Sequence, residues 1–218
     1  MKFAHIADTH IRNLKYHKEY REVFNQLYTK LKKEKVDFII HCGDIAHTKT
    51  QISPEFVDMC TNFFKNLSAI APTYIILGNH DGNLRNSTRQ DALSPIVSAL
   101  NNKNLFLLKN SGEVELNDQF TINVLSVFDR ENWQSPSDRN RINIALYHGA
   151  VSGVKTDTGW TMVKMISISL IILTMVFLEI FTKPINPLTK REEYDIAVQQ
   201  YNKTMEKQTT RVFYYGTF

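Results

Sequence analysis

Side chains that bind divalent metals follow apolar runs at four points of this sequence. The first run is followed by Asp-Thr-His, the second by Gly-Asp, the third by Gly-Asn-His-Asp, and a fourth ends in Tyr-His-Gly. Carboxylates, imidazoles and an amide carbonyl together suit ions such as manganese, iron or zinc. The pattern indicates a metal centre, and its candidate residues are Asp8, His10, Asp44, Asn79, His80 and His148.

Alternating strand and helix signals would position these residues. Apolar runs end at Asp8, Asp44 and Asp81. Between them, helical spacing of apolar residues predicts one helix around residues 20–31, and Ser53-Pro54 predicts the start of another. Such alternation predicts an α/β fold with a parallel sheet, and ligands bind at the carboxyl ends of its strands.

The rest of the first 150 residues continues as a mixture of elements. A further helix is expected over residues 87–100, and short strands over 105–128 with a turn at Leu-Asn-Asp-Gln. Residues 141–149, Arg-Ile-Asn-Ile-Ala-Leu-Tyr-His-Gly, predict one more buried strand. No internal repeat, low-complexity segment or clear linker precedes about residue 155.

Each motif by itself is weak, because a single histidine at a strand end is usually structural. Four such motifs in order, each after an apolar run, favour a common site. His5, His41 and Cys42 fit packed positions on their strands, whereas His47 follows the Gly-Asp turn and could contact substrate. His47 is therefore a candidate substrate-binding residue.

The order of the motifs resembles the calcineurin-like metallophosphoesterases. Asp-x-His, Gly-Asp, Gly-Asn-His-Asp and a strand ending in histidine occur in that order, over about residues 1–162. The context Tyr-His-Gly-Ala-Val-Ser-Gly is most similar to the SbcD-type nuclease branch, especially the small subunit of tailed-phage recombination endonucleases. The resemblance implies an α/β fold in which a β-sandwich is flanked by helices.

The resemblance also implies a role for each candidate residue. Asp8 and His10 would hold one metal ion, and Asp44 would bridge two. Asn79 and His148 would hold the second ion, and His80 would donate a proton to the leaving oxygen or stabilise it. Two divalent cations, with manganese favoured, can activate water and stabilise both oxygens of an in-line displacement at phosphorus.

By the same resemblance, the protein is a metal-dependent phosphodiesterase, a DNA exonuclease or endonuclease subunit in recombination and repair. Its expected partners are DNA, an SbcC-type coiled-coil ATPase subunit and a second copy in a homodimer. Two alternatives stay open. One is another metallophosphoesterase, acting on small phosphodiesters or phosphoproteins, and the other is a non-catalytic metal-binding or membrane-associated module.

The last part of the chain departs from the family pattern. That pattern closes with a Gly-x-x-His motif, yet no histidine follows His148. An apolar segment, Ser-Ile-Ser-Leu-Ile-Ile-Leu-Thr-Met-Val-Phe-Leu-Glu-Ile-Phe at residues 167–181, appears instead. Only 14 uncharged residues separate Lys164 from Glu179, whereas a spanning helix needs about 20. The segment therefore does not fit a membrane anchor.

A change of reading frame explains this departure. Codons for residues 178–183 can be written so that reading from the third base yields Gly-Asp-Ile-His-Lys, the missing motif. We therefore expect an incomplete nuclease domain over residues 1–162, with the sandwich truncated at its C-terminal side, and an out-of-frame tail over 163–218. Activity of this chain is expected to be weak or absent.

The amino-acid composition excludes several other classes of protein. Hydrophobic content of 43% and charged content of 22% are ordinary for a globular protein. Two cysteines are too few for a disulfide framework, and no secretory signal opens the sequence. The expected location is cytoplasmic, which means the host cytoplasm if the gene belongs to a phage.

Overall fold

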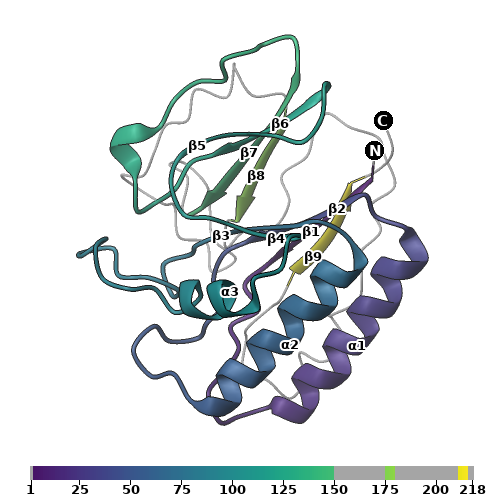
Figure 1. The fold of residues 1–218 in the computed structure, drawn as a ribbon, viewed down its shortest axis with the longest axis vertical. Helices are drawn as coiled ribbons and strands as arrows, with labels where there is room; N and C mark the ends of the chain where they lie inside the picture. Colours follow the sequence, from purple (N-terminus) through teal and green to yellow (C-terminus); the bar gives the residue numbers. More distant parts are fainter. Residues whose placement is uncertain (1, 150–174, 180–210, 216–218) are drawn as a thin grey trace, which may run out of the picture. The chain divides into compact units, whose positions relative to one another are not determined.

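The structure, a computed structural model, describes residues 2–149, 175–179 and 211–215 (Figure 1). The chain divides into two compact units. One contains Met1–Leu108 together with Glu193–Phe218, and the other contains Lys109–Glu192. Each unit is built around one sheet, and the α/β class expected from the sequence is confirmed.

The first unit contains a five-stranded sheet in the order β4-β3-β2-β1-β9. Strands β1 to β4 are parallel, and β9 pairs with β1 in the antiparallel direction. The parallel arrangement brings the carboxyl ends of β1, β2 and β3 to one edge of the sheet. The strands are β1 Phe3–Ala7, β2 Phe38–Cys42, β3 Thr73–Ile76, β4 Leu105–Leu108 and β9 Arg211–Tyr215.

Three helices connect the parallel strands: α1 His17–Glu34, α2 Pro54–Ile70 and α3 Ser94–Leu100. The strands follow one another across the sheet without reversal, so right-handed crossovers place all three helices on the same face. Figure 1 shows them in a row, and α2 contacts both α1 and α3. The helices therefore cover one face of this sheet.

Both long helices form where the sequence predicts them. The apolar stripe of α1 is buried at Tyr20, Phe24, Leu27, Tyr28 and Leu31. Helix α2 begins after the N-cap Ser53, whose Oγ accepts a hydrogen bond from the Phe56 amide at 3.2 Å, and Pro54 occupies the first turn. Aromatic contacts then join the helices, with the ring centroids of Phe24 and Phe63 4.3 Å apart.

The helix expected over residues 87–100 is shorter than predicted. Helix α3 begins only at Ser94, because the Asp91 carboxylate accepts hydrogen bonds from the Leu93 and Ser94 amides at 2.9 and 2.7 Å. Pro95 in the first turn is compatible with that start. The preceding residues form turns and bends, since a local side-chain acceptor competes with helical hydrogen bonding there.

The second unit contains a four-stranded sheet in the order β5-β6-β7-β8. Strands β5 and β6 are antiparallel, whereas β6, β7 and β8 are parallel. The predicted turn at residues 116–119 is confirmed, and Asn117 Oδ1 accepts from the Gln119 and Phe120 amides. The elements are β5 Gly112–Glu115, β6 Phe120–Val124, the 3₁₀ helix η1 Arg130–Asn132, β7 Ile142–His148 and β8 Met175–Glu179.

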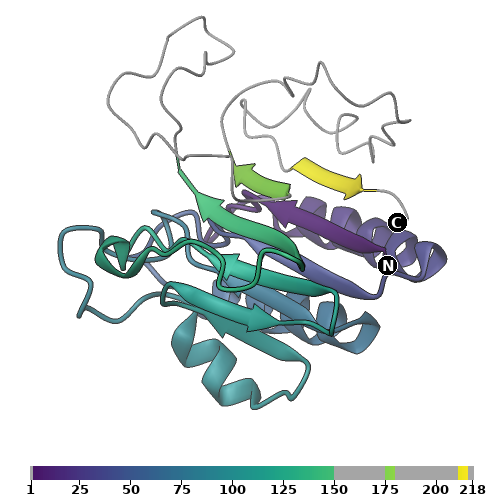
Figure 2. The ribbon, with the colours of Figure 1, turned by 90° about the horizontal axis from the view of Figure 1, so that it is seen from above.

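Two strands fall within the tail expected over residues 163–218. Strand β8 extends the second sheet beside β7, as Figure 2 shows in green, and β9 pairs with β1. The rest of that expected tail, including most of the apolar segment at 167–181, lies outside the described residues. Among the described helices, none has the length and apolar content that crossing a bilayer requires.

Candidate metal centre

Three loops at the carboxyl ends of β1, β2 and β3 form the candidate metal centre. The first two loops are joined through their backbones, because the Asp8 amide donates to Gly43 O at 3.1 Å and the His10 amide to Asp44 O at 2.9 Å. The third loop is bound to the second by the His80 amide, which donates to Asp44 Oδ1 at 2.8 Å. Neighbouring parallel strands thus bring together residues far apart in sequence.

The backbone at this edge adopts an unusual conformation. Asp8, His10 and Asp44 have φ values of 51°, 44° and 53°, in the left-handed region that residues with a side chain seldom enter. The Tyr20 hydroxyl donates to His10 O at 2.6 Å and helps to hold that conformation. Such backbone strain tends to concentrate at functional sites, and here it falls on three predicted ligands.

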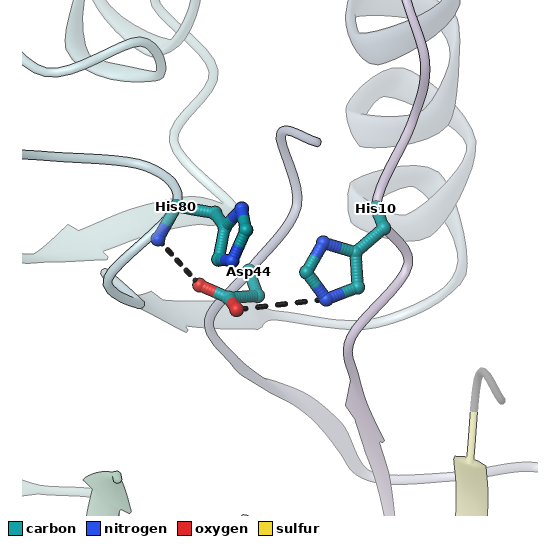
Figure 3. Close-up of side chains that lie close together, drawn as sticks. All are labelled: His10, Asp44 and His80. Atoms are coloured by element: carbon teal, nitrogen blue, oxygen red, sulfur yellow. Dashed lines mark hydrogen bonds and ion pairs between the residues drawn. The ribbon is translucent and has the colours of Figure 1, made fainter. Parts of the chain in front are cut away.

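The side chains of His10, Asp44 and His80 converge (Figure 3). One ligand atom from each of the three lies within 4.8 Å of the others. His10 Nε2 is 3.5 Å from Asp44 Oδ2 and 3.4 Å from Asp8 Oδ1. Asp8, His10 and Asp44 are all buried, with Asp44 entirely inaccessible to solvent. Two buried carboxylates therefore face one buried imidazole.

These distances fit ligands of a shared cation. Separations of 3.4 and 3.5 Å are longer than ordinary nitrogen–oxygen hydrogen bonds. Two atoms that each lie about 2.1 Å from one ion at a tetrahedral angle are themselves about 3.4 Å apart. Buried carboxylates also require positive charge nearby, because isolated charges are costly to bury. The donor set of Asp8, His10 and Asp44 therefore suits a divalent metal.

His80 is oriented differently from a simple ligand. Its Nδ1 lies 2.8 Å from the carbonyl oxygen of His47, so Nδ1 carries the proton and donates it. The His10 and His80 rings meet edge to face, with centroids 4.8 Å apart. With Nδ1 occupied, Nε2 is the nitrogen able to exchange a proton with a substrate. This geometry is compatible with the proton-donating role predicted for His80.

Two residues of the third loop support the site, although neither was among the predicted site residues. Asp81 is buried, and its carboxylate accepts from the Gly78 amide at 2.9 Å and the Ala46 amide at 2.8 Å. It therefore joins the second and third loops. A side chain at Gly78 would overlap Asp44, since an added Cβ would lie only 2.9 Å from Asp44 Cγ. The Gly-Asn-His-Asp motif contains both residues and was the available signal.

The other predicted site residues have less defined surroundings. Asn79 is half-buried, and its backbone carbonyl accepts from Lys49 Nζ at 2.9 Å. His148 ends β7 in the second unit, where Glu179 of β8 lies opposite it in the parallel register. The ligand roles of Asn79 and His148 stay predictions, because neither is defined by these contacts.

His47 lies beside the histidine cluster. Its ring stacks against His80 with centroids 6.2 Å apart and meets His10 edge to face at 5.9 Å. Burial lowers the pKa of His47, and the Arg12 guanidinium and the neighbouring His10 and His80 lower it further. A half-buried, neutral imidazole at this position can contact substrate, so its substrate-binding role stays a prediction.

His5 and His41 occupy the packed positions expected from the sequence. Burial lowers the pKa of His5 to about 4, although the nearby Asp8 carboxylate opposes this shift. His41 is fully buried, with Nε2 3.4 Å from Thr9 Oγ1 and its ring edge against Phe63. Both therefore support the strands and loops below the site.

Comparison with known proteins identifies relatives of this chain. The sequence profile described as calcineurin-like phosphoesterase matches residues 1–197. An uncharacterized protein of Acanthamoeba polyphaga mimivirus is 44% identical over 172 residues, which cover 72% of this chain. The match spans only 13% of the viral protein.

A solved structure also resembles the chain. The crystal structure of the Pseudomonas putida nuclease MPE aligns with a TM-score of 0.39 and 18% sequence identity. The alignment covers 66% of this chain and 59% of that one.

Proposed function

Because the chain belongs to the calcineurin-like phosphoesterase family, we propose that it is a metal-dependent phosphodiesterase whose substrate is DNA. Its place is within the SbcD-type nuclease branch, as a subunit acting in recombination and repair. An SbcC-type ATPase, a second copy of the nuclease subunit and a cytoplasmic location belong to the same proposal. The Tyr-His-Gly-Ala-Val-Ser-Gly context around His148 supports this branch.

The observation that carries the proposal is the position of His10. Its Nε2 lies 3.4 and 3.5 Å from two buried carboxylates, at the strand ends where the family motifs fall. Asp8, His10 and Asp44 would hold one divalent cation, and Asp44, Asn79 and His148 a second, with manganese favoured. When bound, such cations supply an activated water and neutralise charge on the phosphoryl oxygens.

The protein's own groups would then orient the reaction. The His80 amide holds Asp44 Oδ1, so the candidate bridging carboxylate has a defined orientation. His80 Nδ1 is fixed on the His47 carbonyl, which leaves Nε2 to transfer a proton to the departing oxygen. Asp81 holds the two loops that carry Asp44 and His80 at a constant separation. These contacts favour general acid catalysis by His80.

The proposal includes a change of reading frame after about residue 162. In the chain as written, Glu179 lies opposite His148 in adjacent parallel strands. The alternative reading of codons 178–183 would put Gly-Asp-Ile-His at that same strand end. A further histidine ligand would then follow the strand beside His148, as the family pattern requires.

The test compares the 218-residue protein with a version encoded in the restored frame. Both are purified, depleted of metal with EDTA, and assayed with manganese on labelled single-stranded and duplex DNA. We expect cleavage by the restored protein, weak or absent cleavage by the 218-residue protein, and none by restored Asp44→Asn. Hydrolysis of a chromogenic phosphodiester or a phosphoprotein with DNA left intact would favour the other metallophosphoesterase classes.

A further inference from the structure

Two loops beside the candidate metal centre are unusually basic. Residues 9–18 and 45–54 contain no aspartate or glutamate. They contain four permanent cations, Arg12, Lys15, Lys18 and Lys49. Their four charges equal the formal net charge of the whole chain, +4, and three of them lie in the loops while Lys18 lies in the first turn of α1. We refer to residues 12–16 and 47–53 as the cationic rim.

Hydrogen bonds make the two loops one surface. The Ser53 amide donates to Asn13 Oδ1 at 3.3 Å, and Ser53 Oγ donates to Asn13 O at 2.8 Å. Asn13 Nδ2 also donates to the carbonyl of Gln51, and the His47 amide donates to Ile11 O at 3.1 Å. The rim is therefore held together at several points rather than formed by two independent loops.

Two of its cations border the residues proposed for catalysis. Lys49 Nζ donates to the carbonyl of Asn79, the residue before His80. Arg12 packs over the Tyr16 ring at 5.8 Å from its centroid, and it directly follows Ile11, whose carbonyl accepts from the His47 amide at 3.1 Å. Because His47 stacks on His80, both cations lie near the proposed proton donor.

The rim also exposes apolar side chains. Leu14 is 74% exposed and Ile52 is 41% exposed, and they are two of the five large hydrophobic residues exposed in the described part of the chain. An isolated phosphate group would use only the cations. A nucleic-acid strand presents phosphates to the cations and apolar base faces to residues such as Leu14.

We propose that the cationic rim binds a nucleic-acid strand next to the bond that is cut. Arg12 and Lys49 contact backbone phosphates adjacent to the scissile one, and Leu14 and Ile52 contact bases. The inference rests on the proposed nuclease function and deepens it, because it assigns a surface that selects a polymer over a small phosphodiester. Phosphate contacts of this kind position the strand without reading its sequence.

Binding is measured without metal, so that it does not depend on hydrolysis. Fluorescence anisotropy of a labelled single-stranded oligonucleotide is followed in EDTA over a range of salt concentrations. Each lost phosphate contact lowers the slope of log K against log salt by about 0.7 for single strands. For the double variant R12Q/K49Q we expect the magnitude of the slope to fall by roughly 1.4. If the two proteins bind equally at about 1 M salt, the variant should therefore bind roughly 25-fold more weakly than wild type at about 0.1 M.

A matched variant controls for net charge. K33Q/K65Q removes two exposed lysines from α1 and α2 and leaves the rim intact. We expect it to keep the wild-type slope, and Leu14→Ser to lower affinity without changing the slope. Thermal unfolding in the same buffer shows that each variant is folded. The proposal would be overturned if R12Q/K49Q had the same salt slope as wild type. It would also be overturned if R12Q/K49Q and K33Q/K65Q lost DNA affinity equally.

Two further results separate this inference from its premise. If the rim variants lose DNA binding but the restored protein does not cleave DNA, the rim stands and the nuclease proposal fails. If instead the wild-type protein binds phosphatidylserine vesicles through the rim and does not bind DNA, the nucleic-acid assignment is wrong.

Discussion

Gly78 is not a predicted metal ligand, but its substitution by alanine should disrupt the metal centre by displacing Asp44. The added Cβ would lie 2.9 Å from Asp44 Cγ and closer still to Asp44 Oδ1 and N, whereas ordinary van der Waals contact begins at 3.4 Å. The carboxyl group must therefore move by at least about 0.5 Å from its present position. Metal sites tolerate changes of only about 0.2 Å in ligand distances.

The expected loss follows from that displacement. Changes to residues that orient metal ligands typically lower metal affinity by about 10–100-fold, and we expect Gly78→Ala to reach at least this range. Overpacking of a buried site should also lower the free energy of unfolding by about 1–3 kcal/mol. Isothermal titration of the metal-depleted protein with manganese measures the first effect, and thermal unfolding in EDTA measures the second.

Gly112→Ala provides the control. An added Cβ at Gly112 meets no atom within 4 Å, but the backbone there has φ of 149°, so alanine is strained. This variant should lose stability while keeping its affinity for manganese. Wild-type manganese affinity in Gly78→Ala would refute the assignment of Asp44 as a ligand held in place by close packing.

Three other substitutions test separate parts of the structure. His80→Asn in the restored protein should lower the rate of DNA cleavage by about 10²–10⁴-fold while manganese affinity stays unchanged, and a parallel loss of affinity would show that His80 is a ligand. Asp81→Asn should lower the free energy of unfolding by about 1.5–3 kcal/mol, since its carboxylate accepts two buried backbone hydrogen bonds, and an unchanged denaturant midpoint would contradict that role. The pKa of His5 is about 4 in the folded protein against 6.5 for the free group. Between these two values the unfolded protein binds more protons at His5 than the folded protein does. The free energy of unfolding should therefore fall by up to roughly 3 kcal/mol as the pH drops from 6.5 to 4. Denaturant titrations across that range should show a shallower pH dependence for His5→Leu, and an identical dependence in both proteins would contradict the burial argument.

The helices and the candidate residues were predictable to different degrees from local patterns. Helix α1 follows its apolar spacing, and α2 follows the Ser-Pro start, because both signals lie within the helix itself. The start of α3 was predicted too early, since one carboxylate, that of Asp91, decides where the helix begins. The spacing of apolar residues alone does not indicate where such a helix begins.

The sequence by itself determined which side chains could form a metal centre and that each follows a strand. It also contained the charge pattern of residues 9–18 and 45–54, although no local signal joined these two segments. Only the tertiary structure brought His10, Asp44 and His80 within 4.8 Å, placed Asp8 and Asp44 in left-handed conformations, and joined the two basic loops through Asn13. The physical reason is that these contacts connect residues more than 30 positions apart, such as Asp44 and His80. Their distances depend on the register of neighbouring strands, whereas the period of a helix or strand depends on adjacent residues alone.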